Sequence, residues 1–441
     1  MLPPLFLSVR VPTLLARLWR SLFGEKPGSG LPRRGRLSII IFRLDAMGDV
    51  AMTTPLFREL KRAYPKSHCT AVVQHAFRPL LVTNPHIDEI LTLPELPAAA
   101  YLPRRAKQLI AALLLYWRDL RRRRYDIAIS PRWDLDEHLA TLLCQLTNAT
   151  ERVGYTENVS PLKQRLNRGF DAAFSICLPG GPVRHEVVRN LAVVEAFGGT
   201  VQDSSLDVRL TERDREFATR LLASVSASTN LIALGIGAHS PGRCWPLERY
   251  AECLSRLGHK AGVRPVIVCS ANERQEALRL SHLLSCEAFI LCGAPLREVC
   301  AVLERCDLFI GNDTGSAHLA AAMDCKTIVI SRHPRDGDPN HGNSPLRFAP
   351  YCAKARVLQP MTGLDACTDG CRALGPHCIV AVTVDEVVSA AQAMLGSKPA
   401  MGQFEKLEGV IRAPKHRELP LEAIANQACG ALTGQVLKGL G

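Results

Sequence analysis

The sequence predicts an α/β protein made of two consecutive Rossmann-like, doubly wound domains. From residue 37 onward, short continuous apolar runs that suit buried parallel strands alternate with helical segments. The alternation begins again near residue 206. A chain of 441 residues with 47% hydrophobic content is long and apolar enough for at least two globular domains. Two such domains imply a central cleft that both face, with ligands at the carboxyl ends of the strands.

The first series of elements begins with the apolar run 38–42, a loop over 43–48 and a helix that ends near Tyr64, before Pro65. The elements expected after it are a strand over 69–74, a helix over 76–83, a strand over 89–93, a helix over 103–123 and a strand over 126–130.

The second series repeats this order. Its expected elements are a helix over 212–226, a strand over 230–236, a helix from Leu247, strands over 264–270, 288–292, 307–312 and 326–330, and a final helix over 383–395.

These series divide the chain into four parts. They are a basic N-terminal extension with its linker (1–36), a first domain (37–205), a second domain (206–395) and a loosely attached tail (396–441). Within the extension, residues 4–23 have the pattern of a basic amphipathic helix. Such a helix either lies in a membrane interface or packs on its own domain, and the sequence leaves both alternatives open.

The formal net charge of +12 is concentrated in two segments. Residues 1–43 hold eight cations and one anion, and residues 104–132 hold nine cations and two anions, so the rest of the chain is slightly acidic. A protein that follows a nucleic-acid backbone spreads its cations more widely, so we expect no nucleic-acid binding. An anionic lipid would suit the segment 104–132, although such runs are usually a solvated helix face.

The cysteines and the N-terminus indicate a cytoplasmic protein. Many of the 16 cysteines lie inside apolar runs, as Cys69 and Cys306 do, which favours reduced, buried thiols over a disulfide framework. Pro3, Arg10 and Pro12 interrupt the N-terminal apolar stretch, so we expect no signal peptide. No run of about 18 uncharged apolar residues predicts a transmembrane helix.

The first informative loop, residues 43–49, follows a buried strand and contains Gly48 and Asp49. Gly48 permits close backbone approach, and Asp49 lies where the next helix begins, facing the cleft. Taken alone, Asp49 is also explained as a helix cap.

Two further loops offer sites for anions. Residues 235–246 contain Gly237, which leaves backbone amides free, and Arg243, a fixed cation. Residues 311–318 run from a strand into an Asn-Asp-Thr-Gly-Ser turn and then a helix. The ordinary alternatives are a turn with a surface arginine in the first loop and capping by Thr314 or Ser316 in the second.

Taken together, the three loops resemble glycosyltransferase family 9, the ADP-heptose:lipopolysaccharide heptosyltransferases. The runs D-A-M-G-D-V-x-x-T-T-P, R-x-W-P and N-D-T-G-x-x-H occur in the family's order and approximate separation, and the resemblance spans residues 37–395. It implies the GT-B architecture, with the acceptor held mainly by the first domain and the nucleotide sugar mainly by the second. It also implies inverting heptosyl transfer from ADP-heptose to the lipopolysaccharide inner core, without a metal or another cofactor.

The resemblance also assigns residues. Asp49 matches the general base that takes the proton of the acceptor hydroxyl. Arg243 stands where the family usually has Lys, and it would stabilise the departing diphosphate. The residues expected to bind the donor are Gly237, Arg243, Asp313, Thr314, Gly315, Ser316 and His318, and those expected to contact the acceptor are Gly48, Thr53 and Arg132.

Several alternatives stay open. One is a family-related transferase that uses another nucleotide sugar or acceptor, and another is a non-catalytic, membrane-tethered protein that binds sugar nucleotides. A nicotinamide-dependent oxidoreductase lacks a convincing G-x-G-x-x-G motif. Cys367, Cys371 and Cys378 depart from the usual spacing of zinc ligands, so we expect thiols and no metal there. The expected partners are ADP-heptose, an anionic glycolipid and, peripherally, the cytoplasmic face of the inner membrane.

Overall fold

The computed structural model describes residues 36–96, 103–147, 149–226, 228–258, 262–364 and 375–396. All of them belong to one compact unit, Met1–Gly396. The helix expected within residues 4–23, Cys367, Cys371 and the tail after Gly396 lie outside the described residues. Across the part that is described, no helix is both long and apolar enough to cross a bilayer.

The first sheet is parallel and has six strands in the order β3-β2-β1-β4-β5-β6. Its strands are β1 (Ser38–Arg43), β2 (His68–Gln74), β3 (Glu89–Leu93), β4 (Ile127–Ser130), β5 (Glu151–Tyr155) and β6 (Ile176–Leu178). The helices associated with it are α2 (Met47–Ala63), α3 (Arg104–Leu115), α4 (Ala140–Leu146), α5 (Pro161–Leu166) and α6 (Glu186–Ala196). The α3 helix continues into one π-helical turn, η2 (Tyr116–Leu120).

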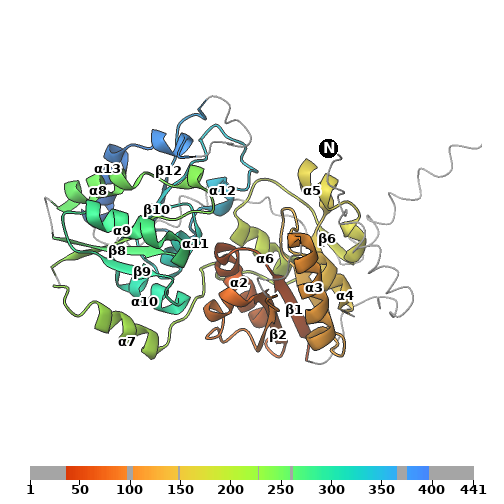
Figure 1. Cartoon of the computed structure of the whole chain (residues 1–441). Coiled ribbons are helices and arrows are strands. Elements are labelled where there is room, and N and C mark those ends of the chain that lie inside the picture. Colours follow the sequence, from red (N-terminus) through yellow and green to blue (C-terminus); the bar gives the residue numbers. More distant parts are fainter. Residues whose placement is uncertain are drawn as a thin grey trace, which may run out of the picture. The chain divides into compact units, whose positions relative to one another are not determined.

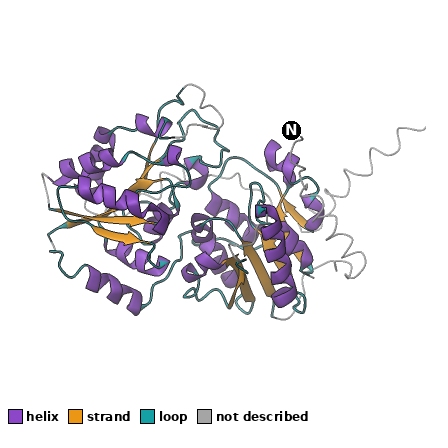
Figure 2. Ribbon diagram, viewed as in Figure 1, coloured by secondary structure: helices purple, strands orange, loops and turns teal. Residues whose placement is uncertain are grey.

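The second sheet repeats this topology, with the order β12-β11-β10-β7-β8-β9 (Figures 1 and 2). Its strands are β7 (Asn230–Gly235), β8 (Val263–Cys269), β9 (Phe289–Cys292), β10 (Leu308–Asn312), β11 (Thr327–Ile330) and β12 (Ala355–Leu358). Its helices are α7 (Glu212–Leu221), α8 (Leu247–Gly258), α9 (Arg274–Leu283), α10 (Leu296–Arg305), α11 (Gly315–Ala322), α12 (Pro345–Phe348) and α13 (Val384–Gly396).

The predicted doubly wound fold is therefore confirmed, and the differences are local. Residues 75–80 form a 3-10 helix, η1 (His75–Leu80), where a longer helix is expected, and Pro79 lies within it. Pro79 has no N–H to donate to a continuing α-helix. The long helix expected over 103–123 is the α-helix α3 followed by the π-turn η2.

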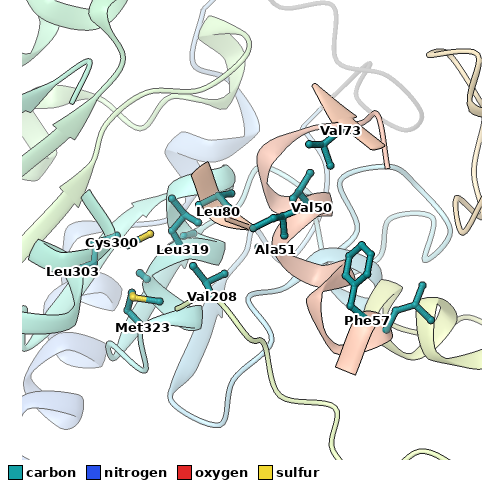
Figure 3. Packing of buried hydrophobic residues seen from close by; sticks show 14 of the residues in the cluster. Val50, Ala51, Phe57, Val73, Leu80, Val208, Cys300, Leu303, Leu319 and Met323 are labelled. Carbon is teal, nitrogen blue, oxygen red and sulfur yellow. The ribbon is translucent and has the colours of Figure 1, made fainter. Parts of the chain in front are cut away.

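Alternate residues of the first sheet pack on opposite faces. Ile39 and Ile41 join the core with α2 and α6, whereas Ile40 and Phe42 pack beside α3 and α4. The first of these cores continues into the second half of the chain. Figure 3 shows Leu80 close to residues of α10 and α11 in this shared cluster. An apolar core thus joins the two halves of the chain.

Candidate functional site

The candidate residues follow the strands at which each sheet reverses its order. In the first sheet this switch point lies between β1 and β4, and in the second between β7 and β10. Ligands of doubly wound sheets bind beyond the carboxyl ends of these strands. Asp49 and Arg132 follow β1 and β4, whereas Arg243 and Asp313 follow β7 and β10.

Asp49 lies in the first turn of α2 and is half-buried. The N-cap of α2 is Ala46 and not Asp49. Asp49 lies three residues further on, and its Oδ2 accepts a hydrogen bond from the N–H of Ala46 at 3.2 Å, so it stabilises the start of the helix from within the first turn. Burial raises the pKa of Asp49, and the carboxylate of Asp45 raises it further, while Arg43 and Arg132 partly offset the increase. A carboxylate with a raised pKa is a stronger base than an ordinary aspartate.

Asp45 lies between two guanidinium groups. Its Oδ2 is 2.9 Å from Nη1 of Arg43, and its Oδ1 is 3.0 Å from Nη1 of Arg132. Burial opposes the charge on Asp45, but the two arginines outweigh it and hold its pKa below the ordinary value. Arg132 is therefore engaged in an ion pair, and part of its side chain remains exposed. This cluster fixes the charges around Asp49.

Thr53 is fully buried beneath this cluster. Its hydroxyl donates to the backbone carbonyl of Asp49 at 2.7 Å and accepts from Nε of Arg43, also at 2.7 Å. The same guanidinium donates to Oδ1 of Asn190 at 2.7 Å. Thr53 therefore connects the Asp49 turn to Arg43 inside the protein.

Asn312, at the end of β10, holds the two loops of the second sheet together. Its Oδ1 accepts from the backbone N–H of Trp245 at 2.9 Å and from the hydroxyl of Tyr250 at 3.2 Å. Its Nδ2 donates to the carbonyls of Ile236 and Gly237 at 2.7 and 3.3 Å. One buried amide thus joins the loop that contains Gly237 and Arg243 to the turn that starts α11.

Arg243 and Asp313 are brought into direct contact. Nη2 of Arg243 lies 3.1 Å from Oδ2 of Asp313 and also donates to the carbonyl of Asp313. Burial raises the pKa of Asp313, and Arg243 partly offsets this. Beside them, the hydroxyls of Thr314 and Ser316 lie 2.9 Å apart at the N-terminus of α11. The positive end of that helix and the guanidinium group therefore lie together.

Gly237 has little free space on its other side. A Cβ built on it would lie 1.9 Å from the carboxylate of Glu273. That carboxylate also accepts from the N–H of Ser270 at 2.8 Å. Glu273 is therefore part of this loop cluster, although no motif in the sequence indicates it. Its position just beyond β8 is the one signal that could have identified it.

The two halves of the site meet where α2 contacts α11. A Cβ built on Gly48 would lie 2.5 Å from Cδ2 of His318, and one built on Gly315 would lie 2.5 Å from Cε of Met47. His318 is buried, and its Nδ1 has no hydrogen-bond partner in the described structure. Burial, with His185 and Arg243 nearby, lowers the pKa of His318 to about 3, so the ring is neutral. The turn that carries Asp49 thus lies directly against the His318 helix.

A second charged network lies beside this contact, and no motif in the sequence indicates it. Oε1 of Glu186 accepts from Nη1 of Arg189 at 2.8 Å and from Nη2 of Arg347 at 2.8 Å. Nη1 of Arg347 also lies 2.9 Å from Oδ2 of Asp134. The guanidinium carbons of Arg189 and Arg347 lie 3.7 and 4.6 Å from the ring centroid of Trp133. The network joins segments from both halves of the chain.

Of the three cysteines near the C-terminus, Cys378 lies within the described residues. Cys378 is buried and its sulfur lies 3.5 Å from Nδ1 of His377. Within the described ranges, no group of three or more His, Cys, Asp or Glu side chains has the arrangement of a metal site.

A comparison with protein families identifies the family of the chain. Residues 113–338, about half of the chain, match the model of glycosyltransferase family 9 (heptosyltransferase). The chain belongs to glycosyltransferase family 9. The family suggested by the three loops is thereby confirmed.

Individual relatives of this family 9 glycosyltransferase are distant. The chain is 24% identical to lipopolysaccharide heptosyltransferase 3 of Escherichia coli over 289 residues, which are 64% of this chain and 78% of that one. A family 9 structure from Veillonella parvula aligns with a TM-score of 0.65 at 21% identity, covering 83% of this chain and 99% of that chain. The E. coli heptosyltransferase WaaC with ADP aligns with a TM-score of 0.59 at 17% identity, covering 81% and 100%. These structures confirm the GT-B fold.

Proposed function

We propose that this family 9 glycosyltransferase moves a heptosyl group from ADP-heptose to a hydroxyl of the lipopolysaccharide inner core, with inversion at the anomeric carbon. The observation that carries the proposal is the packing of the Gly48–Asp49 turn against the His318 helix. It brings a carboxylate with a raised pKa next to a loop cluster suited to a diphosphate. The relatives support the choice of substrates, since one is a lipopolysaccharide heptosyltransferase and another has a structure with ADP.

In the proposed step, the acceptor oxygen attacks the anomeric carbon from the face opposite the diphosphate. As the new C–O bond forms, Asp49 takes the hydroxyl proton, and the bond to the diphosphate oxygen breaks with its electron pair. Arg243 and the backbone amides at the start of α11 stabilise the charge on the departing ADP. This positive charge supports a transfer that needs no metal ion.

The other residues have supporting roles in this proposal. Asp313 binds sugar hydroxyls and shapes the Arg243 loop, while Thr314 and Ser316 contact phosphate oxygens. Gly237, Gly315 and His318 complete the donor site. On the acceptor side, Gly48 and the exposed part of Arg132 contact the acceptor, whereas Thr53 acts from the interior by holding Arg43 and the Asp49 turn. Residues 37–205 thus form the acceptor domain and residues 206–395 the donor domain.

The decisive test is Asp49→Asn in the full-length chain. The amide keeps the shape of the side chain but cannot accept the proton, so turnover should fall by at least about 10²-fold, the lower end of general-base contributions. The ADP dissociation constant should change little, because the Arg243 cluster is intact. Glu386→Gln is the matched control, since Glu386 makes the same hydrogen bond to the start of its own helix, at Thr383, outside the site.

Near-normal turnover of Asp49→Asn would remove Asp49 as the base. Binding of ADP without transfer from any nucleotide sugar by the wild type would instead favour a non-catalytic binding protein. Unchanged wild-type activity after treatment with EDTA is the expected result for transfer without a metal, and loss of activity that added metal restores would contradict it.

A further inference from the structure

The helix α3 and the turn η2 present an apolar face to solvent. Their inner side packs on the first sheet through residues such as Ala112 and Leu115. On the outer side, Leu113, Leu114 and Trp117 are 39, 46 and 50% exposed. Residues three and four apart share one helix face, so these large side chains form one continuous patch. We call Leu113, Leu114 and Trp117 the α3 patch.

Cations precede and follow the α3 patch in the sequence. The segment 104–124 contains eight Lys and Arg residues and one acidic residue, Asp119. Asp119 pairs with Arg118, and Arg123 pairs with Glu89. The remaining cations are exposed or half-buried, and they are Arg104, Arg105, Lys107, Arg121, Arg122 and Arg124. The guanidinium carbon of Arg121 lies 5.0 Å from the ring centroid of Trp117.

This pattern differs from that of an ordinary solvated helix in the same chain. Helix α7 also carries several arginines, but acidic residues alternate with them, and Arg220 lies 4.0 Å from Glu216. In segment 104–124 the cations greatly outnumber the anions, and they border large apolar side chains. A basic, amphipathic surface of this kind matches the interface of an anionic bilayer.

We propose that the α3 patch and its exposed cations bind the surface of a bilayer that contains anionic lipid. Leu113, Leu114 and Trp117 enter the boundary between headgroups and acyl chains, and the arginines lie over the negatively charged headgroups. Nη1 of Arg105 donates to the carbonyl of Glu137 at 3.0 Å, in the loop that follows Arg132. The helix therefore starts beside the proposed acceptor side of the site. Binding to the bilayer does not depend on the proposed sugar transfer.

The experiment is sedimentation of the full-length chain with phosphatidylcholine vesicles, with or without a quarter of phosphatidylglycerol. We expect binding to the anionic vesicles alone, and weaker binding at high salt. Each cation near such a surface contributes about fivefold to the partition constant, so Arg121→Glu with Arg122→Glu should lower it at least about 25-fold. The matched control is Arg213→Glu with Arg220→Glu on α7, which should bind like the wild type.

The apolar part of the surface has its own variant and control. Leu114→Ser with Trp117→Ser should lower the partition constant at least tenfold. Leu278→Ser with Leu283→Ser replaces two leucines on α9, each 43% exposed, and should not change it. In a Trp19→Phe background, brominated lipid should quench the tryptophan fluorescence of the bound protein. Adding Trp117→Phe should largely abolish this quenching, because the remaining Trp133 and Trp245 are only 2 and 1% exposed.

Equal binding to both kinds of vesicle, or α3 variants that bind as well as their controls, would overturn the proposal. A second result would also overturn it: a wild type that does not bind vesicles and is a dimer in sedimentation velocity. If Leu114→Ser with Trp117→Ser dissociated that dimer, the α3 patch would contact a second copy of the chain and not a bilayer. Vesicle binding must also persist in Asp49→Asn. This separates failure of the surface from failure of the proposed transfer.

Discussion

Glu186 and Arg347 form one ion pair, but we expect their removal to have unequal costs. Glu186 is 3% exposed and is shared by Arg189 and Arg347, whose side chains are 2 and 0% exposed. Among the described residues, Glu186 is the only carboxylate that pairs with Arg189, and Nε and Nη2 of Arg189 have no hydrogen-bond partner there. Glu186→Gln therefore leaves the charge of Arg189 without a counterion. Leaving a buried charge unpaired costs about 3–5 kcal/mol, so the free energy of unfolding should fall by that amount.

Arg347→Met should cost less. Glu186 keeps its 2.8 Å contact with Arg189, and Asp134, the other partner of Arg347, is 21% exposed and can be hydrated. Methionine also fills much of the volume that the arginine occupies. With the lost stacking on Trp133 included, we expect a cost of about 1–3 kcal/mol.

The assay is thermal unfolding of both variants and of the double variant, followed by tryptophan fluorescence. Glu186→Gln should unfold at the lower temperature. The double variant should be more stable than the sum of the single losses indicates, because the two residues interact directly. If Arg347→Met is as destabilising as Glu186→Gln, or if the losses simply add, the interpretation that an unpaired Arg189 dominates the cost is wrong.

Three further predictions concern the site itself. Gly48→Ala places a methyl group 2.5 Å from the ring of the buried His318, so kcat should fall at least about tenfold and the free energy of unfolding by about 1–3 kcal/mol, and unchanged kcat would contradict the tight contact. Asp45→Asn removes a negative charge that raises the pKa of Asp49. Because the base must be ionised, the acid limb of the kcat/KM profile should move to lower pH, and a shift to higher pH would refute this sign. Arg243→Ala should weaken ADP binding at least about tenfold, measured by calorimetry, because it removes a charge-assisted hydrogen bond that contributes about 1.5–3 kcal/mol. Unchanged affinity would remove Arg243 from the site.

The sequence predicts the buried strands well, because each is a continuous apolar run between helices. It does not indicate β5, β6 or β12, which have only three to five residues, and β5 includes Glu151 and Arg152. Such short, partly charged segments become strands because a neighbouring strand is already in place to pair with them.

In the site, too, the sequence predicts residues that lie in one short loop but not contacts between residues far apart in the chain. The loops that contain Asp49, Arg243 and Asp313 are recognisable because each is a compact run that follows a strand. The pairing of Glu186 with Arg347 spans 161 residues and involves no motif, so only the folded chain reveals it. The enclosed position of Thr53 is likewise a property of packing, since its neighbours in the sequence do not distinguish a buried hydroxyl from an exposed one.

The four hydrogen bonds of the Asn312 amide also have a consequence for ligand binding. Because this buried side chain aligns both loops of the proposed donor site in the free protein, the conformational entropy of ordering them is lost during folding and not during association. The proposed donor site is therefore preorganised from within the second sheet. A nucleotide sugar that enters it meets backbone already in place, so its affinity reflects its contacts rather than a cost of shaping the loops.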